Sequence, residues 1–317
     1  MKMNLKKNNT CAIKYSRDFI GYGNNSPNFR WPNNTNIAIQ FVLNYEEGGE
    51  SHIQNGDKFS EKFLSDITNA QEYNNIHMSM DSIYEYGSRV GCLRIMKEFQ
   101  KRNLPLTIFA VAIALEKNSE IISIIKSNYF DIVSHGFRWI NYQNINEKIE
   151  KKHIDQAVKI FIKIFNKKPT GWYTGRDSPN TRRLIVENGS FIYDSDYYGD
   201  DLPFWTKVTC KNKIIKPHLI IPYTLDCNDM RFVTQQGFGT SEHFYKYLRD
   251  TFDVLYKEGK NTPKMMSIGM HGRILGRPGR FKGLQNFLDY IQQYKKIWIC
   301  TRQQIAEFWI KNFPYSF

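Results

Sequence analysis

The sequence predicts an α/β fold, a distorted (β/α) barrel of about seven parallel strands, and three observations support this prediction. Short apolar runs rich in β-branched and aromatic residues alternate along the chain with longer segments of helical apolar spacing. The run at residues 37–43 is apolar almost throughout, which is typical of a strand buried on both faces of a parallel sheet. The 317 residues show neither an internal repeat nor a linker, so we expect a single domain.

The chain begins with a polar segment, residues 1–35, that is rich in Asn, Pro and Gly. We expect this segment to form an arm without regular structure, ahead of a barrel domain at residues 36–317. Aromatic side chains would hold such an arm against the domain or against a neighbouring subunit. The arm carries the aromatic residues Tyr15, Phe19, Tyr22, Phe29 and Trp31.

Helices and strands are expected in alternation after the first strand. Residues 51–88 are polar and without a clear period, so we expect a long irregular loop of the kind that forms lids or binding sites. The predicted helices span residues 90–102, 120–126, 145–165, 181–188, 241–257, 281–294 and 303–311. The predicted strands span residues 104–112, 130–134, 171–175, 191–194, 219–225, 264–270 and 297–300.

Two of the predicted helices carry additional signals. The helix at residues 241–257 has Thr240 or Ser241 as its N-cap and stops at Gly259. The helix at residues 145–165 places its apolar residues on one stripe, which is the pattern of an amphipathic helix. That stripe comprises Ile149, Ile154, Val158, Phe161, Ile162 and Phe165.

Composition narrows the function classes. The formal net charge is +13, but the lysines are spread along the chain without an arginine-rich arm or an RNA-binding signature, so no nucleic-acid partner is expected. The 5 cysteines are widely spaced and form no CxxC pair, which favours a reducing compartment over a disulfide framework. The N-terminus lacks the apolar core of a signal peptide, and no apolar run is long enough to span a membrane. We therefore expect a cytoplasmic protein without membrane attachment.

Polar side chains follow several of the predicted strands at the point where each strand ends. Parallel strands of a barrel direct their carboxyl ends to one face of the molecule. We therefore expect these side chains to converge on one cavity, as the groups of an active site do. They are Glu46 and Glu47, His135, Arg176, Asp226 and Asp229, and His271.

The motifs around these residues resemble the polysaccharide-deacetylase (NodB-homology) superfamily, a group of metal-dependent amide hydrolases on a distorted (β/α) barrel. The motifs occur in the superfamily's order: NYEEG at residues 44–48, HGFRW at residues 135–139, Arg176, Asp229 within TLDCNDM, and His271 within SIGMHGR. Longer stretches between about residues 15 and 308 resemble the allantoinase type of this superfamily, its urate-catabolism branch. Among these stretches are VLNYEEGGE, SHGFRWI, PYTLDCNDMRF and MMSIGMHGRILGRPGR.

Two metal-ligand positions of the wider superfamily are altered in this chain. Glu47 stands in place of an Asp, and Trp139 stands in place of the second His. A catalytic zinc ion needs three protein ligands, and the Trp indole nitrogen is a donor only. We therefore expect no metal and no other cofactor, in agreement with the metal-independent branch that the chain resembles. A metal held by rearranged groups such as His52 or His77 is the alternative.

The resemblance implies that the chain opens the hydantoin ring of allantoin to allantoate, with a small ureide as substrate and a homo-oligomer, a tetramer, as its assembly. Glu46 would be the general base, and its proximity to Glu47, together with burial, would raise the pKa of one member of the pair. Arg176 would hold and orient that base. His271 would be the general acid, and Asp229 would fix its tautomer. Substrate contacts are expected from Glu47, His135, Trp139, Tyr86, Asp196 and Trp205.

Two other functions are compatible with the same pattern. A metal-dependent carbohydrate N-deacetylase would share the fold, but it would need an intact metal site and an open sugar groove. A binding or scaffold protein without activity would have no need to keep Glu46, Arg176, Asp229 and His271 together.

Overall fold

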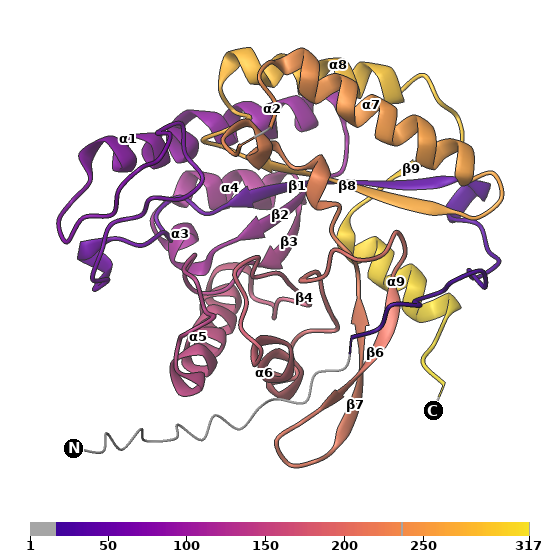
Figure 1. Ribbon diagram of the computed structural model, residues 1–317, viewed down its shortest axis with the longest axis horizontal. Coiled ribbons are helices and arrows are strands. Elements are labelled where there is room, and N and C mark those ends of the chain that lie inside the picture. Colours follow the sequence, from indigo (N-terminus) through magenta and orange to yellow (C-terminus); the bar gives the residue numbers. More distant parts are fainter. Residues whose placement is uncertain (1–16, 236, 317) are drawn as a thin grey trace, which may run out of the picture.

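The computed structural model describes residues 17–235 and 237–316, which form one α/β unit around a curled sheet (Figure 1). Nine strands in the described residues have the order β6-β7-β5-β4-β3-β2-β1-β8, and β9 pairs with β1. All pairs are parallel except β6 with β7, and the sheet is open between β6 and β8. The predicted distorted barrel is thus confirmed, in the form of a half barrel. The strands are β1 (Ile37–Tyr45), β2 (Thr107–Ala110), β3 (Asp131–Ser134), β4 (Gly171–Trp172), β5 (Tyr193–Asp194), β6 (Phe204–Thr209), β7 (Ile215–Ile220), β8 (Lys264–His271) and β9 (Ile297–Ile299).

Helices cover the outer face of the curled sheet, except for the last helix, which packs against the core inside the barrel (Figure 1). They follow the strands in alternation, as predicted, and α6 has the predicted bounds. The helices are α1 (Met78–Tyr86), α2 (Cys92–Arg102), α3 (Ala112–Glu116), α4 (Ser119–Ser127), α5 (Glu147–Phe165), α6 (Thr181–Asn188), α7 (Ser241–Glu258), α8 (Pro278–Ile291) and α9 (Arg302–Asn312). None of the helices in the described residues is long and apolar enough to cross a membrane.

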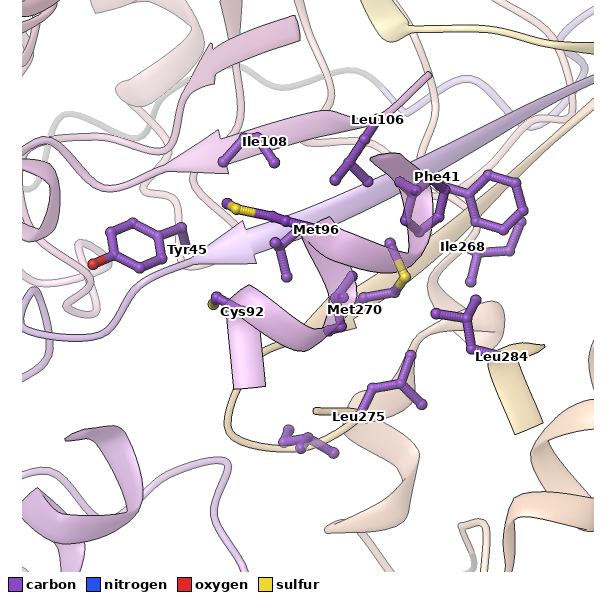
Figure 2. Close-up of a cluster of buried hydrophobic side chains, with 14 of the residues drawn as sticks. Phe41, Tyr45, Cys92, Met96, Leu106, Ile108, Ile268, Met270, Leu275 and Leu284 are labelled. Atoms are coloured by element: carbon purple, nitrogen blue, oxygen red, sulfur yellow. The ribbon is translucent and has the colours of Figure 1, made fainter. Parts of the chain in front are cut away.

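Strand β1 is the centre of the sheet, because it pairs with β8 on one side and with β2 and β9 on the other. All of its residues are buried, as the apolar run predicts. Alternate side chains point to opposite faces of a strand. Phe41 and Tyr45 accordingly pack with Cys92 and Met96 of α2 in the outer core (Figure 2), whereas Val42 joins the core inside the barrel. Residues of β1 with even numbers thus lead towards the barrel interior, where Glu46 follows.

Three local predictions are wrong. Residues 51–88 are not irregular throughout, because they contain α1 and the first part of a π-helical turn at Gly87–Gly91. Strand β6 was not predicted, since its residues are mostly half-exposed and form no apolar run. The strand predicted at residues 219–225 lies at Ile215–Ile220 instead. Its first residues are exposed in the β6–β7 hairpin and form no apolar run, so the sequence pattern does not reveal where the strand begins.

The apolar stripe predicted for α5 is narrower than expected. Ile149 and Ile162 are 49% and 39% exposed, respectively, whereas Ile154, Val158 and Phe161 are buried. The buried face also includes a charged residue, Glu150. Its carboxylate accepts hydrogen bonds from the hydroxyl groups of Ser178 and Thr181, and these partners offset the cost of its burial.

Three aromatic residues hold the described part of the arm against the domain. The Tyr22 hydroxyl donates to the carbonyl oxygen of Pro203. Trp31 is 1% exposed and its indole N–H donates to the carbonyl oxygen of Lys264 at 2.8 Å. Phe29 packs edge-on against Trp31 and Trp309. Phe19, by contrast, is 78% exposed and does not anchor the arm, and Tyr15 lies outside the described residues.

Candidate active site

Two histidines meet at one carboxylate oxygen where β1, β3 and β8 end. Glu46 Oε1 lies 3.1 Å from His135 Nε2 and 3.4 Å from His271 Nε2. The three residues are 2%, 1% and 4% exposed, respectively. The strand-end pattern in the sequence therefore predicts correctly which side chains come together here. We refer to these three residues as the Glu46 cluster.

Asp229 completes this arrangement from the first position of a short 3-10 helix at Asp229–Phe232. Its Oδ1 lies 2.6 Å from His271 Nδ1, and its Oδ2 accepts backbone N–H groups of His271 and Leu275 at 2.7 and 3.0 Å. Because Asp229 binds both the ring and the backbone of His271, it fixes the ring's orientation and tautomer. The structure thus brings together the predicted Asp229 and His271 pair. Asp226, the other acid of that segment, instead accepts a hydrogen bond from Tyr247.

The guanidinium that holds Glu46 belongs to Arg273, not to Arg176. Arg273 is fully buried, and its Nη2 donates to Glu46 Oε2 at 2.7 Å while its Nη1 lies 3.5 Å from Glu47 Oε1. Arg176 pairs with Glu61 at 3.2 Å and donates to the carbonyl oxygen of Trp139. The prediction that Arg176 orients Glu46 is therefore wrong.

The physical reason lies in the backbone before Arg176. Gly175 has a φ of +66°, and the chain leaves the two-residue strand β4 well before Arg176, so its side chain is directed to the segment 57–66. Arg273 follows His271 by two residues, in the turn directly after the strand that ends at the general-acid candidate. This proximity in the sequence was the signal that could have identified it.

The two adjacent glutamates differ in their ionisation. Burial alone would raise the pKa of Glu46, but Arg273, His271 and His135 outweigh burial and hold that pKa well below its usual value. Burial raises the pKa of Glu47, and the charge of Glu46 adds to the rise while Arg273 opposes it. The pair is therefore split as expected, but Glu47 is the raised member.

The pKa of His271 shifts in the opposite direction to that of Glu46. Burial alone would lower its pKa, but the carboxylates of Asp229 and Glu46 raise it to about 9. His271 is accordingly an imidazolium near neutral pH, and it faces an ionised Glu46. His135 donates from Nε2 to that carboxylate, and its Nδ1 is buried without a hydrogen-bond partner among the described residues.

The segment 57–66, which we call the lid, packs against residues that border the Glu46 cluster. Its Glu61 pairs with Arg176, the ring of Phe63 stacks on Trp139 with centroids 6.0 Å apart, and the carbonyl oxygen of Leu64 accepts from Arg273 Nε at 3.0 Å. Trp139 is thereby 5% exposed, with the guanidinium groups of Arg176 and Arg273 4.7 and 5.0 Å from its ring. Its predicted stacking on a substrate ring requires the lid to move.

Three predicted substrate-binding residues lie apart from the Glu46 cluster and form no hydrogen bond to it within the described residues. The Tyr86 hydroxyl donates to the carbonyl oxygen of Gly276, and its ring lies under Arg277. Asp196 accepts backbone N–H groups beside a separate cavity of about 580 Å³. The indole of Trp205 donates to the carbonyl oxygen of Phe313, on the far side of the β6–β7 hairpin.

A contact between glycines sets the position of the loop that carries His271 and Arg273. The π-helical turn brings Gly91 against Gly272, where a Cβ atom on Gly91 would overlap the carbonyl oxygen of Gly272. A Cβ atom on Gly87 would likewise overlap the carboxylate of Glu47. Such π-helical turns occur frequently at functional sites. Here the turn lets a helix approach Glu47 and Gly272 as closely as backbone atoms allow.

The donor set does not fit a divalent metal. In the described part of the chain, no three His, Cys, Asp or Glu side chains are grouped so that they could hold a metal ion. Glu47 Oε1 instead accepts the backbone N–H of Arg273 at 3.3 Å, and Trp139 offers no lone pair. His52 pairs with Asp81 at 3.2 Å, and the ring of His77 accepts the backbone N–H of Met80, so these histidines do not replace the missing ligand.

Comparisons with known proteins identify the family. The polysaccharide deacetylase family profile matches residues 69–185. A protein of Schizosaccharomyces pombe described as a putative polysaccharide deacetylase is 41% identical over 300 residues, which cover 90% of this chain and 94% of that protein.

Two solved structures are also similar over nearly the whole chain. A probable polysaccharide deacetylase from Pseudomonas aeruginosa PAO1 is 51% identical with a TM-score of 0.91, covering 95% of this chain and 100% of that one. PuuE allantoinase is 49% identical with a TM-score of 0.92, covering 96% of this chain and 100% of that one. The resemblance seen in the motifs is thus confirmed: the chain belongs to the polysaccharide deacetylase superfamily and is an enzyme of the hydrolase class.

Proposed function

We propose that the chain hydrolyses the cyclic amide bond of allantoin and releases allantoate, without a metal ion. The proposal rests on the buried row of side chains Asp229, His271 and Glu46, in which each residue contacts the next. The set of metal ligands beside this row is incomplete within the described residues. The likeness to PuuE allantoinase, at 49% identity and almost full coverage, supports the substrate class.

The reaction adds water across one C–N bond of the ring. Glu46 removes a proton from the water, the water oxygen bonds to the ring carbonyl carbon, and the C–N bond breaks as His271 gives its proton to the leaving nitrogen. Direct contact between Glu46 and His271, at 3.4 Å, then lets the proton return from the base to the acid. Asp229 stabilises the imidazolium that precedes and follows the step.

The depressed pKa of Glu46 in the closed site agrees with this cycle. The attraction of His271 contributes to that depression. A water molecule and a ring that separate Glu46 from His271 weaken this attraction, so the carboxylate becomes more basic when it is needed as a base. Arg273 stays bound to the other carboxylate oxygen and keeps Glu46 oriented. The lid opens to admit the substrate, because all members of the Glu46 cluster are buried.

A second candidate is a metal-dependent carbohydrate N-deacetylase, which the names of the Schizosaccharomyces pombe and Pseudomonas aeruginosa relatives favour. One assay separates the two functions. The purified protein is incubated with racemic allantoin, following allantoate, and in parallel with N-acetylated chitooligosaccharides, following acetate. Allantoate without acetate supports the proposal, and acetate without allantoate would replace it with the deacetylase.

A further inference from the structure

The hydroxyl group of Tyr223 has an unusual set of neighbours. Tyr223 is 1% exposed, and the side-chain amides of Asn44 and Asn228 each place their Nδ2 atom 3.3 Å from its oxygen. A phenol hydroxyl has two lone pairs and one proton. Each of the two amides therefore contacts either a lone pair of the hydroxyl oxygen or its proton.

Both amides are fixed as donors by their other contacts. Asn44 Nδ2 also donates to the carbonyl oxygen of Met270 at 3.2 Å, so that end of the amide carries the hydrogens. Asn228 Oδ1 accepts the backbone N–H of Met230 at 2.8 Å, which leaves its Nδ2 facing Tyr223. The two amides thus occupy both lone pairs of the hydroxyl oxygen. Its own proton has no acceptor among the described residues, and leaving a buried donor unpaired is costly.

The Tyr223 hydroxyl contacts two residues that adjoin the candidate active site. Asn44 comes two residues before Glu46 and is opposite His271 in the β1–β8 register, and Asn228 comes directly before Asp229. Gly269 provides the space, because a Cβ atom there would overlap the Tyr223 hydroxyl.

Aromatic contacts link Tyr223 to the Glu46 cluster as well. The rings of Phe109 and Tyr173 both contact His135, with centroids 6.2 and 5.0 Å away, and both contact Tyr223, at 5.8 and 5.1 Å. Tyr223 also borders a cavity of about 950 Å³, whose lining includes Tyr198 and Met230 but no member of the Glu46 cluster. Burial raises the pKa of Tyr223, which keeps the phenol protonated over the working pH range.

We propose that the Tyr223 hydroxyl donates its hydrogen bond to the carbonyl oxygen of the amide that is hydrolysed, and that it stabilises the oxyanion formed when water attacks. This inference rests on the proposed function only in taking a carbonyl carbon as the point of attack. Asn44 and Asn228 are positioning residues, which aim the proton by filling both lone pairs of the oxygen. A donor held in place in this way needs no reorganisation when the negative charge develops.

Tyr223→Phe tests the proposal, because it removes the hydroxyl and keeps the ring. The matched control is Tyr193→Phe: Tyr193 is also buried inside the barrel, and its hydroxyl has no hydrogen-bond partner within the described residues. We expect kcat of Tyr223→Phe to fall by about 10²–10³-fold, as for removal of one oxyanion donor. KM should rise by no more than about tenfold, the loss expected for one hydrogen bond to the carbonyl of the bound ring, and Tyr193→Phe should stay within twofold of the parent. Melting curves give the folded fraction by which each rate is divided.

The pH profile distinguishes donation to the substrate from a purely structural role. If Tyr223 only supported Asn228 and hence Asp229, its loss would disturb His271 and move the alkaline limb of the profile. Donation to the carbonyl predicts lower rates at every pH with an unmoved limb. A moved limb, or rates within threefold of the parent, would overturn the proposal.

The substrates keep this test separate from the proposed function. The kcat of Tyr223→Phe is compared with that of the parent on allantoin or on N-acetylated chitooligosaccharide, whichever the parent hydrolyses. Both substrates present an amide carbonyl. A parent active on the saccharide alone refutes the proposed function and still tests Tyr223. Calorimetry with hydantoin provides a readout without turnover. About tenfold weaker binding by Tyr223→Phe supports the donor, and equal titrations of the two proteins count against it.

Discussion

Glu46 is bordered by two flanks that are held in different ways. The β8 flank, consisting of Asp229, His271 and Arg273, is fixed by buried backbone contacts. Among them are the hydrogen bonds that Asp229 accepts from two backbone N–H groups. The β3 flank, consisting of His135, Trp139 and Arg176, is held by lid side chains, with Glu61 on Arg176 and Phe63 on Trp139. The lid touches the β8 flank through a backbone carbonyl, that of Leu64 on Arg273. Rigid elements hold catalytic groups more precisely than loops do, and mobile loops admit substrates. We infer that the β8 flank carries the proton transfers and that the β3 flank controls access.

The largest expected effect is at the residue between the two flanks. Glu46→Gln keeps the shape of the side chain but removes the base, so turnover should fall by at least about 10²–10⁴-fold. Loss of a buried charge pair with Arg273 should also cost about 3–5 kcal/mol of folding free energy. Glu150→Gln is the control, since Glu150 is equally buried at 2% exposure but lies on α5. Activity within tenfold of the parent, per folded molecule, would remove Glu46 from the mechanism.

On the β8 flank, Asp229 and His271 should behave as one unit. His271→Gln removes the general acid, and adding Asp229→Asn should then cost little more, because groups that act together fail together. The general acid must be protonated, so activity of the parent should decline as the pH rises past the pKa of His271, about 9. Asp229→Asn removes a carboxylate that raises this pKa, so the alkaline limb should move to lower pH.

Measurement of kcat/KM across pH for the four members of this cycle checks both statements. Additive losses together with an unmoved alkaline limb would show that Asp229 does not act through His271.

A smaller effect is expected where the β8 flank packs against the π-helical turn. Gly91→Ala would push the carbonyl oxygen of Gly272 away, and the loop with His271 and Arg273 would have to follow. We expect a loss of about 1–3 kcal/mol in folding free energy and a lower kcat. Gly279→Ala in α8 is the control, since a Cβ atom there meets nothing within 4 Å. Denaturant melts that find the two variants equally stable would contradict this account of the turn.

The smallest effect is expected on the β3 flank. Glu61→Gln weakens the pair that holds the lid to Arg176, which is 19% exposed, so folding should lose no more than about 1 kcal/mol. If the lid controls access, KM should change severalfold while the alkaline limb stays in place. Glu187→Gln breaks a pair of the same 3.2 Å length with Arg183 on α6 and should leave KM unchanged. Equal kinetics for both variants would separate the lid from substrate entry.

The two flanks also differ in how far the sequence predicts them. Apolar strands that end in Glu46, His135 and His271 indicate convergence directly, because the carboxyl ends of parallel strands share one face. Arg176 also follows a strand, but β4 has only two residues and Gly175 turns the chain away, which strand periodicity does not reveal. The direction of the Glu46 pKa shift depends on Arg273, which is near in space only once the loop after β8 has folded back. The lid contacts and the hydroxyl of Tyr223 likewise depend on residues far apart in the chain.

In the proposed mechanism, Asp229, His271 and Glu46 open a ureide ring without a metal ion. The most direct measurement is allantoate formation from racemic allantoin by the purified protein before and after prolonged chelation, with its metal content determined on the same sample. If the proposal holds, the rate of allantoate formation is unchanged by chelation and the protein contains no stoichiometric metal. Stoichiometric zinc, with activity lost on its removal and recovered on its return, would contradict it.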